Sequence, residues 1–229
     1  MKDVGEFARN LGLLFEDEAL LRQAFTHRSY LNEHREEKGG HNERLEFLGD
    51  AVLELATTRY LYDRFPHTPE GELTAYRASL VNAVTLSEIA AEIGMNDYLL
   101  LSRGEAKDTG RARGVLLANA FEALLGAVYL DQGYDAAQRF VAEHLLPNMD
   151  DILQKKLWQD SKSLLQEKGQ EKEGVTPSYT VLRETGPDHD KHFTVGVHLR
   201  TKLLAEGEGK SKQEAEQAAA RNALEKTGW

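Results

Sequence analysis

The first two thirds of the chain carry apolar residues at helical spacing. Such residues recur every three or four positions over 18–25, 43–64, 70–93, 115–130 and 135–146. Up to residue 146 the prolines are Pro66 and Pro69, which fall in one loop, and Thr68-Pro69-Glu70 is a typical helix start. The pattern predicts an all-α domain over residues 1–148, with the Gly-rich segment 102–114 as an exposed loop.

Beyond Pro147 the pattern changes. A polar stretch over 149–159 is expected to connect two domains. In 192–200, apolar and polar residues then alternate with the period of two that is typical of a half-buried strand. The second domain, 160–229, is predicted to be α+β in the order α-β-β-β-α, with elements at 161–170, 179–184, 192–200, 202–206 and 210–226.

Acidic residues interrupt two of the apolar helices. On a helix, Glu46 and Asp50 are neighbours one turn apart, and Glu43 lies one turn earlier on the same side. Acidic helix faces usually meet water, but the apolar residues of 45–55 leave little of this helix for solvent, so it is predicted to be buried. In 115–130, Asn119 and Glu122 also share a face, with no Lys or Arg between them.

Buried carboxylates need a partner, because burying one alone costs several kcal/mol, on the order of a domain's whole margin of stability. Two such helices side by side would form a cluster of oxygen ligands suited to Mg²⁺ or Mn²⁺. A buried polar network remains an alternative. A carboxylate-bridged di-iron site fits poorly, because it needs Glu-x-x-His, whereas Glu43 is followed by Glu46 and Glu122 by Leu125.

The segment Asn42-Glu43-Arg44-Leu45-Glu46-Phe47-Leu48-Gly49-Asp50 closely resembles the signature of the ribonuclease III family. Thr26-His27-Arg28-Ser29-Tyr30 and Phe121-Glu122-Ala123-Leu124 support the resemblance, which covers essentially the whole chain. It implies a helical endonuclease domain and a double-stranded-RNA-binding domain. The implied activity is hydrolysis of duplex RNA to 5′-phosphate and 3′-hydroxyl ends with short 3′ overhangs, in rRNA or mRNA processing.

The resemblance also implies roles for single residues. Asp50 and Glu122 match the catalytic acids, and Glu46, Asp50, Asn119 and Glu122 match the metal ligands. The implied cofactor is Mg²⁺, two ions per active site with substrate bound, with Mn²⁺ as a potential substitute. Asn119 departs from the family, which has Asp there; an amide oxygen can bind a cation but adds no charge. Weaker metal affinity is expected.

Other matches suggest supporting roles. Glu43 and Glu70 correspond to acids near the family's cleft, although a solvated or ion-paired role is equally compatible with them. Phe47 matches an aromatic residue at the interface of a homodimer; without the resemblance it would be taken as a core residue.

The second domain resembles a double-stranded-RNA-binding domain, which contacts 2′-hydroxyls in the minor groove and phosphates across the major groove. The resemblance assigns the minor-groove contacts to Ser163, Gln166, Glu167 and His189, and the phosphate contacts to Lys210 and Lys212. Gln213 stands where the family often has a further Lys. Without the resemblance, two lysines in a Gly-rich turn would be interpreted as an ordinary solvated turn.

Composition changes this interpretation little. The 229 residues carry a net charge of −10, which by itself argues against a nucleic-acid partner. Almost all of the acidic excess, however, lies before residue 160. The absence of cysteine excludes disulfides and thiolate metal sites. The N-terminus does not resemble a signal peptide, and the apolar run 115–130 is too short to span a bilayer, so a cytoplasmic protein with no membrane partner is expected.

Two alternatives to the enzyme remain open. The first is a double-stranded-RNA-binding protein that is weakened or inactive in catalysis, which the substitution at Asn119 favours. The second is a structural helical dimer without RNA, which would leave the interior acids and the Lys210–Lys212 turn unexplained.

Overall fold

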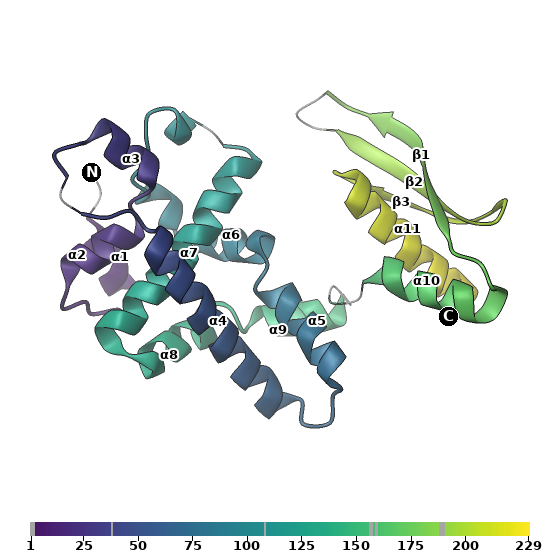
Figure 1. The fold of residues 1–229 in the computed structure, drawn as a ribbon, viewed down its shortest axis with the longest axis horizontal. Helices are drawn as coiled ribbons and strands as arrows, with labels where there is room; N and C mark the ends of the chain where they lie inside the picture. The colour runs from purple at the N-terminus through teal and green to yellow at the C-terminus, as the bar shows by residue number, and fades with distance from the viewer. Residues whose placement is uncertain (1–2, 38, 108, 156–157, 159, 188–190) are drawn as a thin grey trace. The chain divides into compact units, whose positions relative to one another are not determined.

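The computed structural model describes residues 3–37, 39–107, 109–155, 158, 160–187 and 191–229. They form two compact units, Met1–Trp158 and Gln159–Trp229 (Figure 1). In the described part of the first unit the elements are helical: α1 (Val4–Asn10), α2 (Glu18–Ala24), α3 (Arg28–Glu33), α4 (Glu43–Arg64), α5 (Glu70–Leu80), α6 (Ala83–Glu92), η1 (Met95–Asp97), η2 (Glu105–Lys107), α7 (Arg111–Gln132), α8 (Tyr134–His144) and α9 (Asn148–Gln154).

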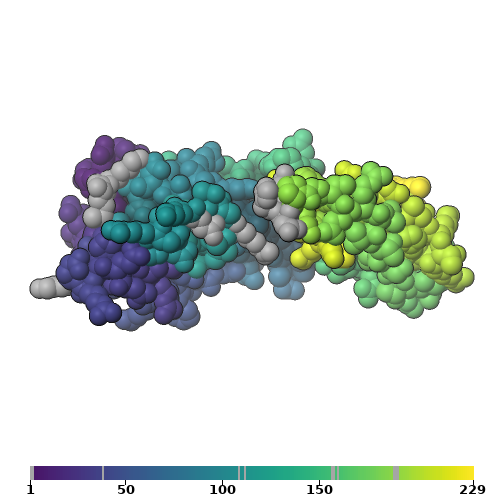
Figure 2. Space-filling view, turned by 90° about the horizontal axis from the view of Figure 1, so that it is seen from above, coloured from purple at the N-terminus to yellow at the C-terminus, as the bar shows by residue number. Residues whose placement is uncertain are grey.

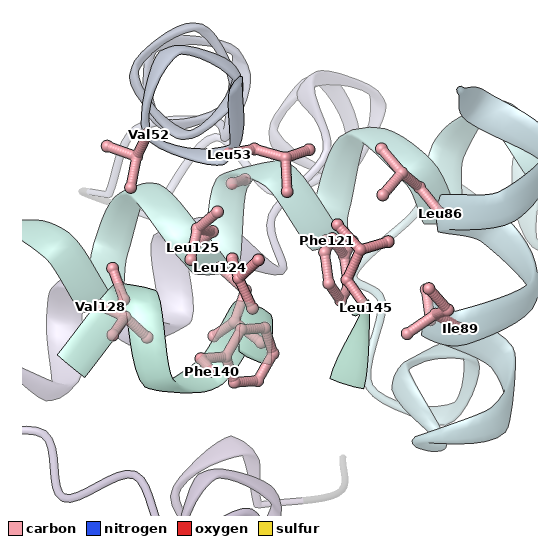
Figure 3. Close-up of a cluster of buried hydrophobic side chains, with 14 of the residues drawn as sticks. Val52, Leu53, Leu86, Ile89, Phe121, Leu124, Leu125, Val128, Phe140 and Leu145 are labelled. Carbon is pink, nitrogen blue, oxygen red and sulfur yellow. The ribbon is translucent and has the colours of Figure 1, made fainter. Parts of the chain in front are cut away.

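Helix α7 is the centre of the first unit. It packs against α2, α4, α6 and α8, and its apolar side chains form the middle of the core (Figure 3). The core residues labelled there are Val52 and Leu53 of α4, Leu86 and Ile89 of α6, Phe121, Leu124, Leu125 and Val128 of α7, Phe140 of α8, and Leu145. Among the described residues, Ala112–Gln132 is the stretch long and apolar enough to cross a membrane, but more than half of it is buried inside the protein.

The N-terminal segment packs beside residues near position 100. Thr26 forms a parallel bridge with Leu100, the Ser29 hydroxyl accepts from the backbone N–H of Ser102 at 3.1 Å, and Glu33 accepts from that of Arg103 at 3.1 Å. The space-filling view shows these blue and teal segments side by side (Figure 2). This contact anchors the start of the loop that precedes α7.

The predicted helix 70–93 is two helices. The chain turns at Asn82, whose side-chain oxygen accepts from the backbone N–H groups of Val84 and Thr85, both at 3.0 Å. This N-cap satisfies donors that a new helix leaves free, so α6 starts where a continuous helix was expected.

The prediction that α4 is buried nearly all round is wrong. Phe47, Leu55 and Tyr62 lie on one face of this helix and are 81%, 56% and 71% exposed. The core takes Leu45, Val52 and Leu53 from another face. The apolar residues of α4 therefore cover two faces, and the described part of the chain leaves one of them exposed.

The connecting segment is shorter than 149–159. Helix α9 begins at Asn148, packs against α5, and buries Met149 and Ile152 in the core of the first unit. Trp158 packs edge-on against Tyr76 with ring centroids 4.9 Å apart. Much of the expected connection is thus part of the helical unit, because its few apolar residues are spaced to reach the core.

The second unit has the predicted α-β-β-β-α order. Its elements are α10 (Ser161–Glu173), β1 (Ser178–Thr185), β2 (His192–Leu199), β3 (Lys202–Gly209) and α11 (Lys212–Thr227). The strands form an antiparallel sheet in the order β1-β2-β3. Helix α11 packs on β2 and β3, with α10 beside it. The core of this unit comprises Leu165, Val197, Leu204, Ala219, Ala220, Ala223 and Leu224.

Candidate active site and RNA-binding surface

Two glycines allow α4 and α7 to touch through their backbones. A Cβ atom on Gly49 would lie 1.8 Å from the carbonyl oxygen of Glu122, and one on Gly126 would lie 2.3 Å from that of Leu45. Both distances are far below van der Waals contact, and the opposing atoms are backbone, which cannot turn away. Only glycine fits at these two crossing points. The close approach places the polar residues of both helices next to one another.

Four predicted site residues meet at this crossing. Glu46 and Asp50 come from α4, and Asn119 and Glu122 come from α7. Burial raises the pKa of Glu122 to about 7, and repulsion from Asp50 and then Glu46 adds to the effect. Burial also raises the pKa of Glu46, with repulsion from Glu43 and Asp50, while a hydrogen bond from Asn119 opposes the rise. These mutual effects show that the four side chains form one cluster, which we call the acidic cluster.

The acidic cluster has no cationic partner in the described part of the chain. The ion pairs described there do not include Glu46, Asp50 or Glu122, whereas the nearby Glu54 binds Arg77 at 2.7 Å. Asp50 is exposed, and the other three side chains are half-buried. The donor set consists of three carboxylates and one amide, all hard oxygen ligands, and its chemistry fits a divalent cation.

The carboxylates are not arranged as a closed metal site. Among the described residues, no group of three or more His, Cys, Asp or Glu side chains is placed so that it could hold a metal ion. The side chains would have to move closer together around a cation. The metal-ligand assignment therefore stays a prediction.

The two supporting acids differ in position. Repulsion from Glu43 helps to raise the pKa of Glu46. Glu43 also forms an ion pair with Arg28 at 3.4 Å. Glu70 is exposed at the start of α5 and accepts a hydrogen bond from the Thr74 hydroxyl at 3.0 Å. The interactions described for Glu70 do not connect it to the acidic cluster.

The predicted minor-groove residues share one exposed face. Ser163, Gln166 and Glu167 lie one turn apart on α10, and all three are exposed. Buried Ser161, Leu165 and Gly169 form the opposite face. His189 falls outside the described residues.

The predicted phosphate contacts lie at the start of α11. Lys210 and Lys212 are exposed on either side of Ser211, which caps the helix by accepting from the backbone N–H of Glu214 at 3.2 Å. The Glu214 carboxylate in turn accepts from the backbone N–H of Lys210 at 2.9 Å. The Lys212 ammonium lies 5.8 Å from the centre of the Phe193 ring. This reciprocal cap fixes the backbone that carries both lysines.

Sequence reasoning missed three contributors. The glycine pair was not singled out, because helix crossings cannot be read from one helix at a time. The Asn119–Glu46 hydrogen bond also depends on that crossing. Asp160 and Gln217 hold the start of α10, and only Asp160 had a readable signal, as an N-cap residue type before a helix.

Two family models match the chain. One, described as ribonuclease-III-like, matches residues 17–149, and the other, described as a double-stranded RNA binding motif, matches residues 161–227.

Curated relatives match over nearly the whole length. The chain is 48% identical over 217 residues to a ribonuclease 3 from Pelotomaculum thermopropionicum, covering 95% of this chain and 90% of the relative. It is 46% identical over 220 residues to a ribonuclease 3 from Enterococcus faecalis, covering 96% and 95%. Among solved structures, the nuclease domain of ribonuclease III from Campylobacter jejuni matches with 35% identity and a TM-score of 0.57, over 63% of this chain and 97% of that one. That structure concerns flexibility in a region involved in dimer formation.

The raised pKa of Glu122 predicts a pH dependence of stability. Folding raises this pKa from 4.5 to about 7, so the folded state holds the proton more tightly. The stabilisation is full below pH 4.5 and is lost as the pH rises through about 7. Without divalent metal, the free energy of unfolding of the wild type should fall relative to Glu122→Gln between pH 4.5 and 8. The loss should be on the order of 1–2 kcal/mol, since solvent screening reduces the effect at this half-buried carboxyl.

Urea unfolding of both proteins across this pH range measures the difference. The matched control is Glu143→Gln, which removes an exposed carboxylate from α8 and should keep the wild-type profile. Parallel profiles for wild type and Glu122→Gln would show that Glu122 does not titrate as described.

Proposed function

The chain belongs to the ribonuclease III family and is an endoribonuclease specific for double-stranded RNA, and from this premise we propose that it cuts duplex RNA by metal-dependent hydrolysis at the acidic cluster. The observation that supports this best is the group of carboxylates without a cationic partner where α4 crosses α7. Burial, and then repulsion from Asp50 and Glu46, raises the pKa of Glu122 there to about 7. A divalent cation would relieve that repulsion. The family is in general metal-dependent.

In this proposal, Mg²⁺ would be held by the carboxylates of Glu46, Asp50 and Glu122 and by the amide oxygen of Asn119. Two ions would bind when RNA is bound, and Mn²⁺ would be a substitute. Bound there, the metal would supply an activated water and stabilise the oxygens of an in-line phosphoryl displacement. Asp50 and Glu122 act as the catalytic acids. An ionised Glu46 only accepts hydrogen bonds, so Asn119 donates its amide N–H to it.

The second unit would hold the duplex. Ser163, Gln166 and Glu167 would face one minor groove, and His189 the next. Lys210 and Lys212 would hold phosphates across the intervening major groove, helped by the positive end of α11. Glu43 and Glu70 remain supporting acids in this proposal, with Glu43 nearer to the cluster.

We also propose that the chain acts as a homodimer through the exposed face of α4. Phe47 is 81% exposed, and it borders an open hollow of about 640 Å³ that is also lined by Leu20, Gln23, His41, Glu43, Arg44, Leu45, Leu48 and Leu130. A protruding aromatic beside a hollow on the same surface is what a two-fold interface needs, since each copy supplies both parts. Each subunit would then cut one strand, leaving 5′-phosphate and 3′-hydroxyl ends with short 3′ overhangs.

The proposed biological role is processing of rRNA and mRNA in the cytoplasm. A second candidate is a double-stranded-RNA-binding protein with weakened or lost catalysis. It is favoured by Asn119, a neutral residue in the acidic cluster where the family has Asp.

Cleavage of a long RNA duplex tests the proposal. With Mg²⁺ or Mn²⁺ the protein should give short duplex products, and a chelator should abolish them. Glu122→Gln should lower the rate at least about a hundredfold, because it removes a ligand and a catalytic carboxylate. Glu143→Gln, of equal charge change on α8, should cut at the wild-type rate. Duplex binding without cleavage in either metal would establish the second candidate instead.

The role of Asn119 has its own test. Asn119→Asp restores a full negative charge at a proposed ligand, so it should lower the metal concentration that gives half-maximal cleavage by about tenfold, the effect of roughly 1.4 kcal/mol in binding. A titration of the cleavage rate with Mg²⁺ measures it. An unchanged requirement would show that this side chain does not touch the metal.

A further inference from the structure

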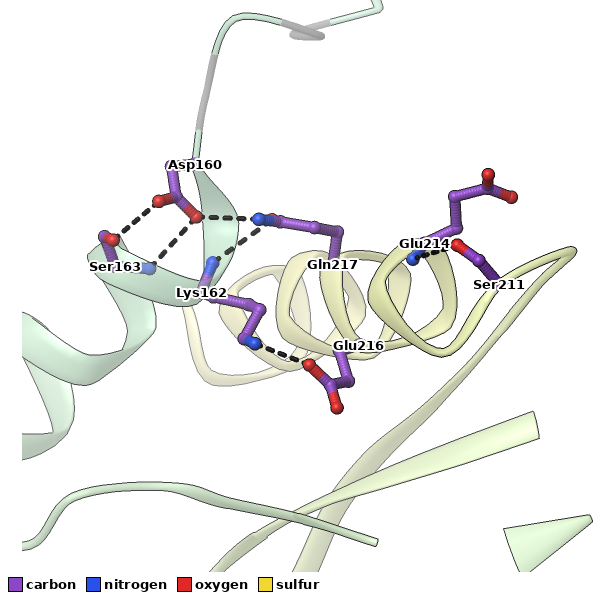
Figure 4. A network of polar contacts seen from close by, with 7 residues as sticks. All are labelled: Asp160, Lys162, Ser163, Ser211, Glu214, Glu216 and Gln217. Carbon is purple, nitrogen blue, oxygen red and sulfur yellow. Dashed lines mark hydrogen bonds and ion pairs between the residues drawn. The ribbon is translucent and has the colours of Figure 1, made fainter. Parts of the chain in front are cut away.

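A network of hydrogen bonds centred on Asp160 holds the start of α10 (Figure 4). One carboxylate oxygen, Oδ2, accepts from the Ser163 hydroxyl at 2.6 Å. The other, Oδ1, accepts from the Ser163 backbone N–H at 3.3 Å and from Nε2 of Gln217 at 2.8 Å. These bonds lower the pKa of Asp160, those from the side chains of Ser163 and Gln217 most strongly. Asp160 is therefore ionised and can only accept.

This direction of bonding fixes the polarity of Ser163. A hydroxyl has one hydrogen to donate and two lone pairs that accept. Since the hydrogen is used on Asp160, the exposed side of the Ser163 hydroxyl is left as an acceptor. A ligand that meets it must bring a donor. The 2′-hydroxyl of RNA can donate, and a 2′-deoxy sugar cannot.

Gln217 orients the carboxylate from a second element. It lies on α11, and besides donating to Asp160 its Oε1 accepts from the backbone N–H of Lys162 at 3.3 Å. Gln217 therefore joins the start of α10 to the helix whose first turn carries Lys212. The bridge fixes the spacing between the predicted minor-groove and phosphate contacts of the unit.

We propose that Asp160, oriented by Gln217, is a positioning residue that makes Ser163 an obligate acceptor for a 2′-hydroxyl and so contributes to selection of RNA over DNA. Asp160 acts through Ser163 and does not itself touch the duplex. The inference rests on the proposed function, because it takes the exposed face of α10 as an RNA contact.

The variant Asp160→Asn changes the direction of the hydrogen bond between residue 160 and the Ser163 hydroxyl while it keeps the helix N-cap. It therefore tests the polarity of Ser163 without disturbing folding. Asn is as good an N-cap as Asp, and its oxygen can keep the place of Oδ1 between Ser163 N–H and Gln217. Its NH₂ group then replaces Oδ2 and donates to the Ser163 oxygen, so the hydroxyl hydrogen turns outward. The outward side of Ser163 then offers one hydrogen and one lone pair in place of two lone pairs, and a 2′-hydroxyl, which can also accept, must turn its own hydrogen to another partner to use that hydrogen. Duplex RNA should therefore bind more weakly, by up to about tenfold, the usual effect of one hydrogen bond.

The charge-matched control is Glu216→Gln. Glu216 is a neighbour on α11 that pairs with Lys162 at 2.5 Å, and its loss removes the same negative charge. Because each variant removes one negative charge, weaker repulsion of the RNA phosphates would by itself make both bind RNA more tightly. The proposal predicts weaker binding for Asp160→Asn alone.

The experiment measures equilibrium binding of the full chain, in chelator to prevent cleavage, to one duplex as RNA and as its 2′-deoxy counterpart. The penalty of Asp160→Asn should appear on RNA and vanish on the deoxy duplex. The double variant Asp160→Asn/Ser163→Ala should bind RNA no more weakly than Ser163→Ala. Unchanged or tighter RNA binding by Asp160→Asn, or an equal penalty on both duplexes, would overturn the inference. Failure of the unaltered chain to bind duplex RNA would instead contradict the proposed function.

Discussion

The backbone contact between α4 and α7 at Gly49 and Gly126 is the constraint on which the first unit depends. Helices with side chains at their crossing keep their axes about 8–10 Å apart. Here a Cβ atom at either glycine would enter the backbone of the other helix. The helices are therefore closer than ordinary packing allows. Glu46 and Asp50 near Gly49 therefore interact with Glu122 and Asn119, which lie one and two turns before Gly126 and would otherwise be separated from them by a layer of side chains.

The electrostatics of the site follow from that contact. Two carboxylates close to the crossing have cationic partners, Glu54 with Arg77 and Glu43 with Arg28. At the crossing, Glu46, Asp50 and Glu122 are held near one another, and the fourth member of the cluster, Asn119, is neutral. Such an arrangement opposes folding unless a proton or a cation compensates it. This repulsion between partly buried carboxylates supports the proposed metal chemistry, because a divalent cation would compensate it.

Sequence patterns predicted most of the secondary structure and the residues of the cluster, for identifiable reasons. Helix α4 was placed at 43–64, and the structure has Glu43–Arg64, because periodicity and the acidic first turn are local signals. The break at Asn82 was missed, although its side chain is a helix N-cap, since apolar spacing continues through it. The exposure of Phe47 was also not readable from the helix itself. Burial depends on which neighbours a side chain has, and the described residues leave one apolar face of α4 largely exposed.

The site was less predictable than the fold. Its acids stood out because carboxylates are rare in apolar helices, and the order of the second unit followed from alternation and caps. What could not be read were contacts between elements: the glycine crossing, the bond from Asn119 to Glu46, and the bridge from Gln217 to Asp160. Each joins residues of two helices, so no periodicity within one segment reports it.

The central claim, that backbone contact at the α4–α7 crossing holds the first unit and its acidic cluster together, is tested most directly by the unfolding temperature of Gly49→Ala. Calorimetry of the full chain should show the transition of the first unit lowered by roughly 5 °C or more, because overpacking against backbone costs at least about 2 kcal/mol. Gly71→Ala, on α5 with no atom within 4 Å of the added methyl, should leave that transition unchanged or raise it slightly. Equal unfolding temperatures for the two variants would contradict the account.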